Sequence, residues 1–170
     1  MSDADRQAFE RFVAENGDRL LHAAFGLCGD WQHAEDLVQQ TLTTLARRWS
    51  AIGANPLGYA YRCLTHANID RWRVVRRRPE VLLDPQELVA VEPSRDAGAS
   101  DDHLAVLAAL QTLPRRQRAI LVLRYLQDLT EADTAAALGI SVGAVKSGAA
   151  RGLARLRADQ SAQPAEVHRD

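Results

Sequence analysis

Cysteine, lysine and long apolar runs are scarce in this sequence of 170 residues. The two cysteines, Cys28 and Cys63, lie far apart and form no CxxC pair or Cys/His cluster, so they predict neither a zinc site nor a disulfide framework. We expect both to be buried thiols. The charged N-terminal region holds no apolar run long enough for a signal peptide or a membrane span. We therefore expect a cytoplasmic protein without a membrane span.

The sequence also lacks the usual signatures of catalysis. It has no phosphate-binding glycine loop. Glu35 and Asp36 are adjacent carboxylates, but consecutive side chains of a helix point about 100° apart. No His or Cys nearby completes a metal set. We predict no catalytic residue, no metal, no cofactor and no enzyme activity.

Charge is segregated along the chain although the net charge is only −1. Residues 56–78 carry 6 basic and 1 acidic side chains, residues 79–110 carry 1 and 7, and residues 111–157 carry 8 and 3. Among the 21 basic residues only Lys146 is a lysine. Two basic blocks separated by an acidic one are typical of phosphate binding at two places, although a solvated basic face has the same composition.

Apolar residues recur at helical spacing in two long segments, and no run alternates as a strand does. We predict an all-α fold of two small helical domains, residues 6–78 and 102–158. The segment 79–101 between them is acidic and rich in proline, which is typical of a linker. Residues 159–170 form a tail that we expect to be frayed.

The second domain contains a helix-turn-helix pattern from Leu129 to Leu156. Thr130 and Asp133 form a capping-box pattern, Gly139 suits a tight turn and Ser141 can cap the second helix. On a helical wheel the apolar face of that helix holds Val142, Val145, Ala149, Leu153 and Leu156. The opposite face is polar and basic, which suits the major groove of DNA. Its candidate contacts are Ser141, Lys146, Ser147, Arg151 and Arg155.

The preceding segment predicts one helix from about Leu113 to Leu126, with Pro114 in its first turn. Its arginines are expected to pack and also to contact phosphate; they are Arg115, Arg116, Arg118 and Arg124. This predicted helix and the helix-turn-helix together have the sequence LPRRQRAILVLRYLQDLTEADTAAALGISVGAVKSGAARGLARLR. This segment resembles region 4 of the extracytoplasmic-function sigma factors of the sigma-70 superfamily, of the sigma-E-like type. The resemblance implies binding to minus-35 DNA and to the polymerase flap. Gly148, Ala149 and Ala150 stand where relatives carry larger side chains, which predicts altered base readout.

The first domain resembles the same family independently. In the helix from Ala34 to Trp49, neutral amides and the carboxylate of Asp36 lie opposite an apolar stripe, a pattern suited to hydrogen bonds with a protein. The segment AEDLVQQTLTTLARRW resembles sigma region 2.2, which docks on the clamp of the polymerase core. The resemblance implies that four residues contact polymerase: Glu35, Asp36, Gln39 and Gln40. His33 and Gln40 replace acidic residues of the family.

The segment NPLGYAYRCLTHANIDRWRVVRRR places basic residues among aromatic ones, which suits single-stranded DNA. It resembles sigma regions 2.3 and 2.4, which melt the minus-10 element and capture a base. The resulting candidate minus-10 contacts are Arg62, His66, Asp70, Arg71, Trp72, Arg73, Arg76, Arg77 and Arg78. Core packing is the commoner role for Trp72. His66 stands where relatives have Asn, which implies a changed preference, and we expect the helix to be interrupted near His66 and Asp70.

The sequence thus predicts an alternative sigma factor that directs RNA polymerase core to promoters and binds both double- and single-stranded promoter DNA. An anti-sigma factor is a further partner that the resemblance allows. The main alternative is a conventional helix-turn-helix regulator, with residues 1–78 as a sensor domain. The basic, aromatic segment before the linker argues against it, because a sensor domain needs no second DNA surface. An interaction protein such as an anti-sigma antagonist would not need the arginines of the recognition helix.

Overall fold

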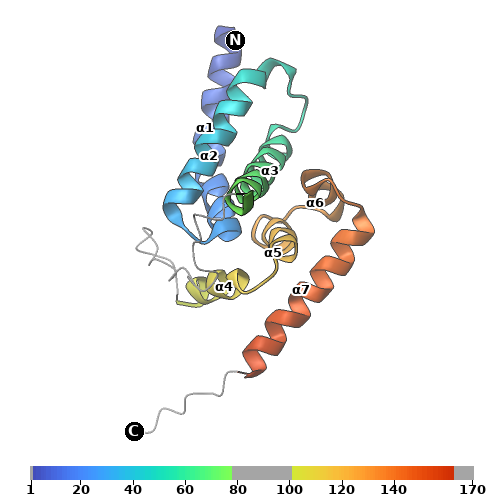
Figure 1. The fold of residues 1–170 in the computed structure, drawn as a ribbon. Coiled ribbons are helices and arrows are strands. Elements are labelled where there is room, and N and C mark those ends of the chain that lie inside the picture. Colours follow the sequence, from blue (N-terminus) through green and yellow to red (C-terminus); the bar gives the residue numbers. More distant parts are fainter. Residues whose placement is uncertain (1, 78–100, 163–170) are drawn as a thin grey trace.

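The computed structural model describes residues 2–77 and 101–162, and all elements in these ranges are helical (Figure 1). The all-α prediction is confirmed for this part of the chain. The first segment contains α1 (Asp3–Cys28), α2 (Trp31–Arg48), the short 3-10 turn η1 (Trp49–Ala51) and α3 (Pro56–Arg77). The second contains α4 (Asp101–Gln111), α5 (Arg115–Leu121), the π-helical turn η2 (Val122–Leu126), α6 (Glu131–Leu138) and α7 (Val142–Ala162).

Capping groups in the sequence fix the first two helices. Ser2 and Asp5 form a reciprocal capping box, so α1 begins at Asp3, earlier than the predicted position 6. α1 ends at Cys28, and the C-cap residue Gly29 has the left-handed φ of 77° that glycine adopts without strain. Asp30 then accepts a hydrogen bond from the backbone N–H of His33 and starts α2. Phe25 and Trp31 stack across this corner with ring centroids 4.1 Å apart.

Helix α3 runs through the region where we expected an interruption. It is continuous from Pro56 to Arg77, so the prediction of a break near His66 and Asp70 is wrong. Leu64, Thr65 and Asn68 are buried along its inner face, and this packing keeps the segment helical. The hydroxyl of Thr65 donates to the Tyr61 carbonyl one turn earlier, which also fits an unbroken helix.

The predicted helix from Leu113 to Leu126 is divided into two elements. Pro114 is the residue before α5 and has the extended ψ of 138°, so α5 begins at Arg115. At Val122 the hydrogen bonding widens to a π-helical turn. This turn ends at Leu126 and is capped by Gln127, and the next residue, Asp128, has a positive φ of 54°. Propensity gave no sign of this change, because helix formers continue through the segment.

The helix-turn-helix prediction is confirmed in its local detail. Thr130 accepts from the backbone N–H of Asp133, Gly139 has a φ of 64°, and the Ser141 hydroxyl accepts from the N–H of Ala144. Val145 is fully buried, as predicted. Val142 was placed on the same apolar face but is 39% exposed, because it lies in the first turn of α7.

The recognition helix lies very close to α5 because small residues line the contact. Gly148, Ala149 and Gly152 are buried there. A Cβ atom on Gly148 would lie 2.4 Å from Cδ1 of Ile120, and one on Gly152 would lie 3.0 Å from Cδ1 of Leu121. Gly148 is therefore a packing residue of α7 and does not stand on its outer face. The helix continues to Ala162, beyond the predicted end at 158, and Thr112 donates to Asp159 in this last part.

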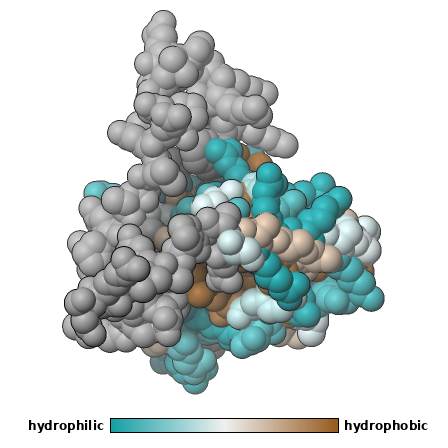
Figure 2. Space-filling view, turned by 90° about the horizontal axis from the view of Figure 1, so that it is seen from below, coloured by the Kyte–Doolittle hydropathy of each residue, from teal (hydrophilic) through white to brown (hydrophobic). Residues whose placement is uncertain are grey.

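The two halves of the chain pack against each other. α3 packs on α6, and α1 packs on α4, α5 and η2, while α2 and α7 lie at opposite edges (Figure 1). Gly26 of α1 permits a close approach, since a Cβ there would lie 3.1 Å from Cγ2 of Val122. Hydrophilic residues cover most of the described surface on the face shown in Figure 2, with hydrophobic patches between them. Among the described residues, no helix is long and apolar enough to cross a membrane.

The glycine contact in α7 can be tested with a matched pair of substitutions. Gly143→Ala, whose Cβ would make only an ordinary contact with the Ser141 hydroxyl at 3.9 Å, should stabilise the fold by about 0.5–1 kcal/mol through helix propensity. Gly148→Ala should destabilise it by about 1–2 kcal/mol, because buried Ile120 must shift. Urea denaturation followed by circular dichroism measures both. Equal stabilisation by the two substitutions would show that α7 and α5 are not closely packed.

The thiol of Cys28 gives a pH-dependent prediction. Burial, offset in part by its hydrogen bond to the Asp30 carbonyl, raises the pKa of Cys28 to about 11. Its thiolate fraction at pH 8 is then about one in a thousand, against roughly a quarter for an ordinary cysteine. In a Cys63→Ser variant, iodoacetamide should label Cys28 about a hundredfold more slowly than in urea. The rate should rise about tenfold per unit between pH 8 and pH 10, and a plateau near pH 9 would contradict the raised pKa.

Candidate nucleic-acid and polymerase interfaces

The outer face of α2 carries the four residues that the sequence assigned to polymerase. Glu35, Asp36, Gln39 and Gln40 are all exposed. The inner face of the same helix is buried as predicted, with Ala34, Val38, Thr41 and Leu45 in the core. Packing thus leaves Asp36 and the two amides available to a partner on one side of a helix that is fixed on the other.

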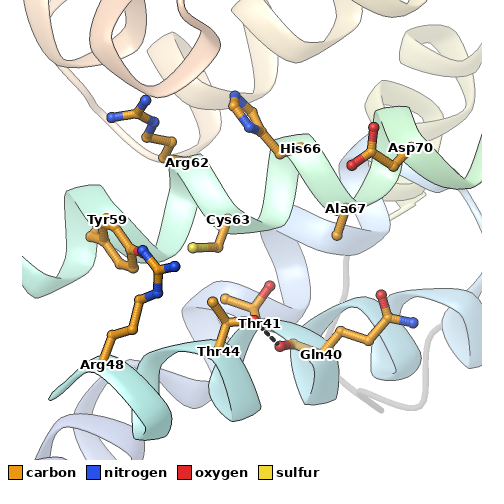
Figure 3. Close-up of a pocket in the computed structure, with 10 residues that line it drawn as sticks. All are labelled: Gln40, Thr41, Thr44, Arg48, Tyr59, Arg62, Cys63, His66, Ala67 and Asp70. Carbon is orange, nitrogen blue, oxygen red and sulfur yellow. Dashed lines mark hydrogen bonds between the residues drawn. The ribbon is translucent and has the colours of Figure 1, made fainter.

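On α3, three candidate minus-10 residues follow one another at intervals of four positions. Arg62, His66 and Asp70 are exposed and come from successive turns of the helix. Figure 3 shows them on the same stretch of α3, with Cys63 and Ala67 on its side toward α2. A cation, an imidazole and a carboxylate in this row offer both donors and acceptors to a base edge.

A pocket of about 760 Å³ lies between α2 and α3 (Figure 3). The residues that line it are Gln40, Thr41, Thr44, Arg48, Tyr59, Arg62, Cys63, His66, Ala67 and Asp70. A second hollow, beside η1, shares Arg48 and Tyr59 with it. The lining combines an aromatic ring, two guanidinium groups and several hydroxyl or amide groups, which is the chemistry that holds an unstacked base next to a phosphate.

Thr41 lies on the α2 side of this pocket with an unsatisfied hydroxyl. The residue is 1% exposed, and its Oγ1 has no hydrogen-bond partner among the described residues. The hydroxyl of Thr44, by contrast, donates to the Gln40 carbonyl at 2.9 Å. A buried hydroxyl without a partner carries an energetic cost.

Sequence reasoning did not identify several of these lining residues as site residues, among them Thr41, Thr44, Arg48, Cys63 and Ala67. Gln40, Thr44 and Arg48 recur every four residues, so they share one side of α2. That spacing was visible in the sequence. What it did not contain was the packing of this side of α2 against α3, which creates the pocket.

On α7 the candidate minus-35 residues form an exposed surface. Ser147, Arg151 and Arg155 are exposed and follow one another at intervals of four positions. Lys146 is exposed as well and pairs with Glu131 of α6 at 3.5 Å. Ser141 caps the helix at its N-terminal end through the Ala144 N–H, at 3.1 Å. The exposed face of α7 thus presents the guanidinium groups of Arg151 and Arg155, while the opposite face of the helix is buried.

The arginines of α5 and η2 divide into internal and external ones. Arg118 donates to the carbonyls of Leu27, Leu110, Gln111 and Leu113. Arg124 donates to the Leu129 carbonyl. The expectation that both also contact phosphate is not supported, because their donors bond backbone carbonyl groups. Arg115 and Arg116 are exposed.

Several candidates fall outside the part of the chain whose side chains the structure describes. Arg71, Trp72, Arg73, Arg76 and Arg77 belong to α3 by their backbone only, and Arg78 lies beyond the described residues. The predicted linker lies outside as well, except for Asp101, which is the first residue of α4, and so does most of the predicted tail. Within the described ranges, no three His, Cys, Asp or Glu side chains gather as a metal ion would require.

Comparison with known proteins identifies both halves of the chain. The family model described as Sigma-70 region 2 matches residues 12–78, and the one described as Sigma-70, region 4 matches residues 103–156. The RNA polymerase sigma-E factor of Streptomyces coelicolor is 37% identical over 152 residues, which cover 88% of this chain and 84% of that protein. The sigma-E factor of Streptomyces antibioticus is 35% identical over 92% of this chain and 87% of that protein.

A solved structure has the same fold. The sigma factor RpoE in complex with the anti-sigma factor NepR, from Bartonella quintana, superimposes with a TM-score of 0.77. The match covers 93% of this chain and 99% of that one at 24% identity, so it bears on the fold alone. The two regions matched by family models and the Streptomyces relatives establish the family. This chain belongs to the extracytoplasmic-function RNA polymerase sigma factors and is an alternative sigma factor.

Proposed function

We propose that this sigma factor acts in the cytoplasm, docking on the polymerase clamp through α2 and reading promoter DNA through two separate surfaces, one on α3 and one on α7. The observation that carries the proposal is the exposure of both surfaces on helices that belong to different sigma regions. A single-site regulator needs only one of them. We assign region 2 to residues 6–78 and region 4 to residues 102–158.

The exposed face of α2 is the proposed clamp contact. Asp36 is its central charge, with Glu35 beside it and Gln39 and Gln40 one turn later. Amides in such a face make directional hydrogen bonds that fix the orientation of a partner. The buried inner face supports this role, because it holds the helix rigid while the outer face is engaged.

The pocket between α2 and α3 is the proposed site for a flipped base of the minus-10 element. His66 and Asp70 supply hydrogen-bonding groups at its rim, and the Tyr59 ring supplies an apolar surface. Arg48 and Arg62 lie close enough to pair with the adjoining phosphates.

Region 4 is the proposed reader of the minus-35 element. Arg151 and Arg155 suit guanine or phosphate, and Ser147 and Lys146 lie beside them on the exposed side of α7. Ser141 lies at the helix N-terminus, where backbone N–H groups favour phosphate. We propose that residues 102–158 also bind the polymerase flap, as their resemblance to sigma region 4 implies.

Further partners follow from the relatives. The sigma factor RpoE of Bartonella quintana was solved in complex with the anti-sigma factor NepR, and we propose an anti-sigma factor as a partner of this chain as well. The acidic segment 79–101 is proposed to run toward the active-site channel of polymerase, where its charge imitates nucleic acid. Chemistry then belongs to polymerase, and this chain supplies no catalytic group.

Run-off transcription with purified core polymerase and a library of promoter fragments tests the proposal. Wild type should give discrete start sites. Asp36→Arg should abolish them by reversing the central charge of the clamp face, whereas Glu15→Arg, the same kind of change on exposed α1, should not. Arg151→Ala should lower transcription about 5- to 150-fold on promoters with the cognate minus-35 base, as expected for one base contact.

Arg157→Ala is the matched control for Arg151→Ala, since both residues are exposed on α7. Wild-type protein that binds a DNA site alone and gives polymerase no promoter-specific starts would overturn the proposal in favour of the conventional regulator. Equal loss for Arg151→Ala and Arg157→Ala would remove the minus-35 assignment only.

The pocket makes a separate prediction. His66→Ala in holoenzyme should weaken binding to single-stranded minus-10 oligonucleotides about 5-fold or more, because one base loses its contact. Fluorescence anisotropy with oligonucleotides from the promoters found by run-off measures it. Gln7→Ala, on exposed α1, is the control. Unchanged affinity for His66→Ala, with the control also unchanged, would show that the base binds elsewhere.

A further inference from the structure

An ion pair joins the two helices of the helix-turn-helix. The ammonium group of Lys146, in the second turn of α7, lies 3.5 Å from the carboxylate of Glu131, the first residue of α6. α6 packs on α7 and directly precedes it in the chain (Figure 1). Lys146 is the single lysine of the sequence and lies on the exposed face of α7 that we propose for the minus-35 element. Its charge therefore has a carboxylate beside it on the DNA-binding helix.

The carboxylate of Glu131 is not needed to begin either helix. Thr130 accepts from the backbone N–H of Asp133, and its hydroxyl donates to the Asp133 carboxylate at 2.6 Å. Ser141 caps α7. The side chains of Lys146 and Glu131 are 63% and 39% exposed, and exposed ion pairs contribute little to the stability of a fold. The pair therefore calls for an explanation other than capping or stability.

The geometry of the pair compensates the charge of Lys146 without occupying its hydrogen-bond donors. A separation of 3.5 Å between Nζ of Lys146 and Oε2 of Glu131 is longer than an ordinary N–H···O hydrogen bond. An ammonium group has three N–H donors on a flexible stem. These donors remain available to another acceptor while the positive charge is partly neutralised.

Such a cation discriminates between the two kinds of acceptor that DNA offers. A phosphate that approaches Lys146 also meets the negative charge of Glu131, which repels it. The O6 and N7 atoms of guanine are neutral acceptors in the major groove and are not repelled in this way. Phosphate contacts add affinity for any sequence, whereas contacts to base edges carry the sequence information. A carboxylate beside Lys146 thus favours the second kind of contact over the first.

We propose that Glu131 is a specificity-determining residue of region 4, which directs Lys146 to a base edge of the minus-35 element and keeps it from binding phosphate. Glu131 is a positioning residue, because it acts through Lys146 and needs no contact with DNA of its own. The inference rests on the proposed function, in which α7 reads the minus-35 element. It adds a residue of α6, the first helix of the helix-turn-helix, to the groups that set promoter selectivity.

Binding of the holoenzyme to duplex DNA at several salt concentrations measures the two kinds of contact separately. One duplex carries a promoter found by run-off transcription, and the other carries the same promoter with a scrambled minus-35 element. Fluorescence anisotropy gives the affinity for each duplex between about 50 and 200 mM salt. Each phosphate contact steepens the plot of log affinity against log salt concentration by about 0.9. A base contact changes the ratio of the two affinities instead.

Glu131→Gln removes the charge and keeps the length and the helix propensity of the side chain. It should raise the affinity for the scrambled duplex and steepen the salt dependence by about 0.9, because Lys146 becomes available to a phosphate. The ratio of the two affinities should fall about 5-fold or more, the smallest change expected for one base contact. Glu131→Gln combined with Lys146→Gln should return the salt dependence to that of wild type, because the released cation is then absent.

Asp133→Asn is the matched control. It removes the same charge from the same turn of α6, and the side-chain partner of Asp133 among the described residues is the Thr130 hydroxyl. The amide oxygen of asparagine still accepts from that hydroxyl. This variant should leave both the salt dependence and the ratio of affinities as they are in wild type. Circular dichroism with thermal unfolding verifies that every variant is folded.

Three results would overturn the inference and leave the minus-35 assignment intact. The first is an unchanged salt dependence and ratio in Glu131→Gln. The second is an equal change in Asp133→Asn, which would assign the effect to the general negative charge of α6. The third is a steeper salt dependence that persists when Lys146→Gln is added. Wild-type holoenzyme that binds both duplexes equally would instead overturn the proposed minus-35 function, and the inference with it.

Discussion

The guanidinium group of Arg118 holds together the helix ends around which the two halves meet. The last carbonyls of a helix lack partners within it, and at buried ends these groups must be satisfied from elsewhere. Arg118 satisfies such carbonyls near the ends of two helices, Leu27 of α1 and the pair Leu110 and Gln111 of α4. Burial, with a smaller contribution from Arg115, lowers the pKa of Arg118, and its charge-assisted hydrogen bonds compensate for that burial. Arg118 thereby ties α5, on which α7 packs, to the ends of α1 and α4.

Arginine therefore has two uses in this chain that composition does not distinguish. Arg19, Arg118 and Arg124 bond backbone or side-chain groups of the chain itself, whereas Arg151 and Arg155 are exposed on α7. The first group determines how the halves are arranged, and the second is available to DNA. The positive charge counted in residues 111–157 overstates the DNA-binding surface for this reason.

Local rules in the sequence were sufficient for most of the fold. The caps at Thr130 and Ser141, the turn at Gly139 and the buried stripe of α2 follow from neighbouring residues alone, and the structure confirms each. The predictions that were wrong depended on distant contacts. The continuity of α3 follows from packing of its inner face. Arg118 was expected to contact phosphate, and its carbonyl partners were not foreseen because they come mostly from other helices. The pocket, likewise, needs two helices to be placed side by side.

The glycines of α7 connect this packing to recognition. Glycine normally weakens a helix, yet Gly148 and Gly152 sit where any side chain would meet Ile120 or Leu121 of α5. This close approach fixes the position of α7 on α5, whose Arg118 bonds the ends of α1 and α4, so the exposed arginines of α7 project from a closely packed helix. Under the proposed function, two readers on separate helices make recognition depend on the spacing of two DNA elements as well as on the bases that each one contacts.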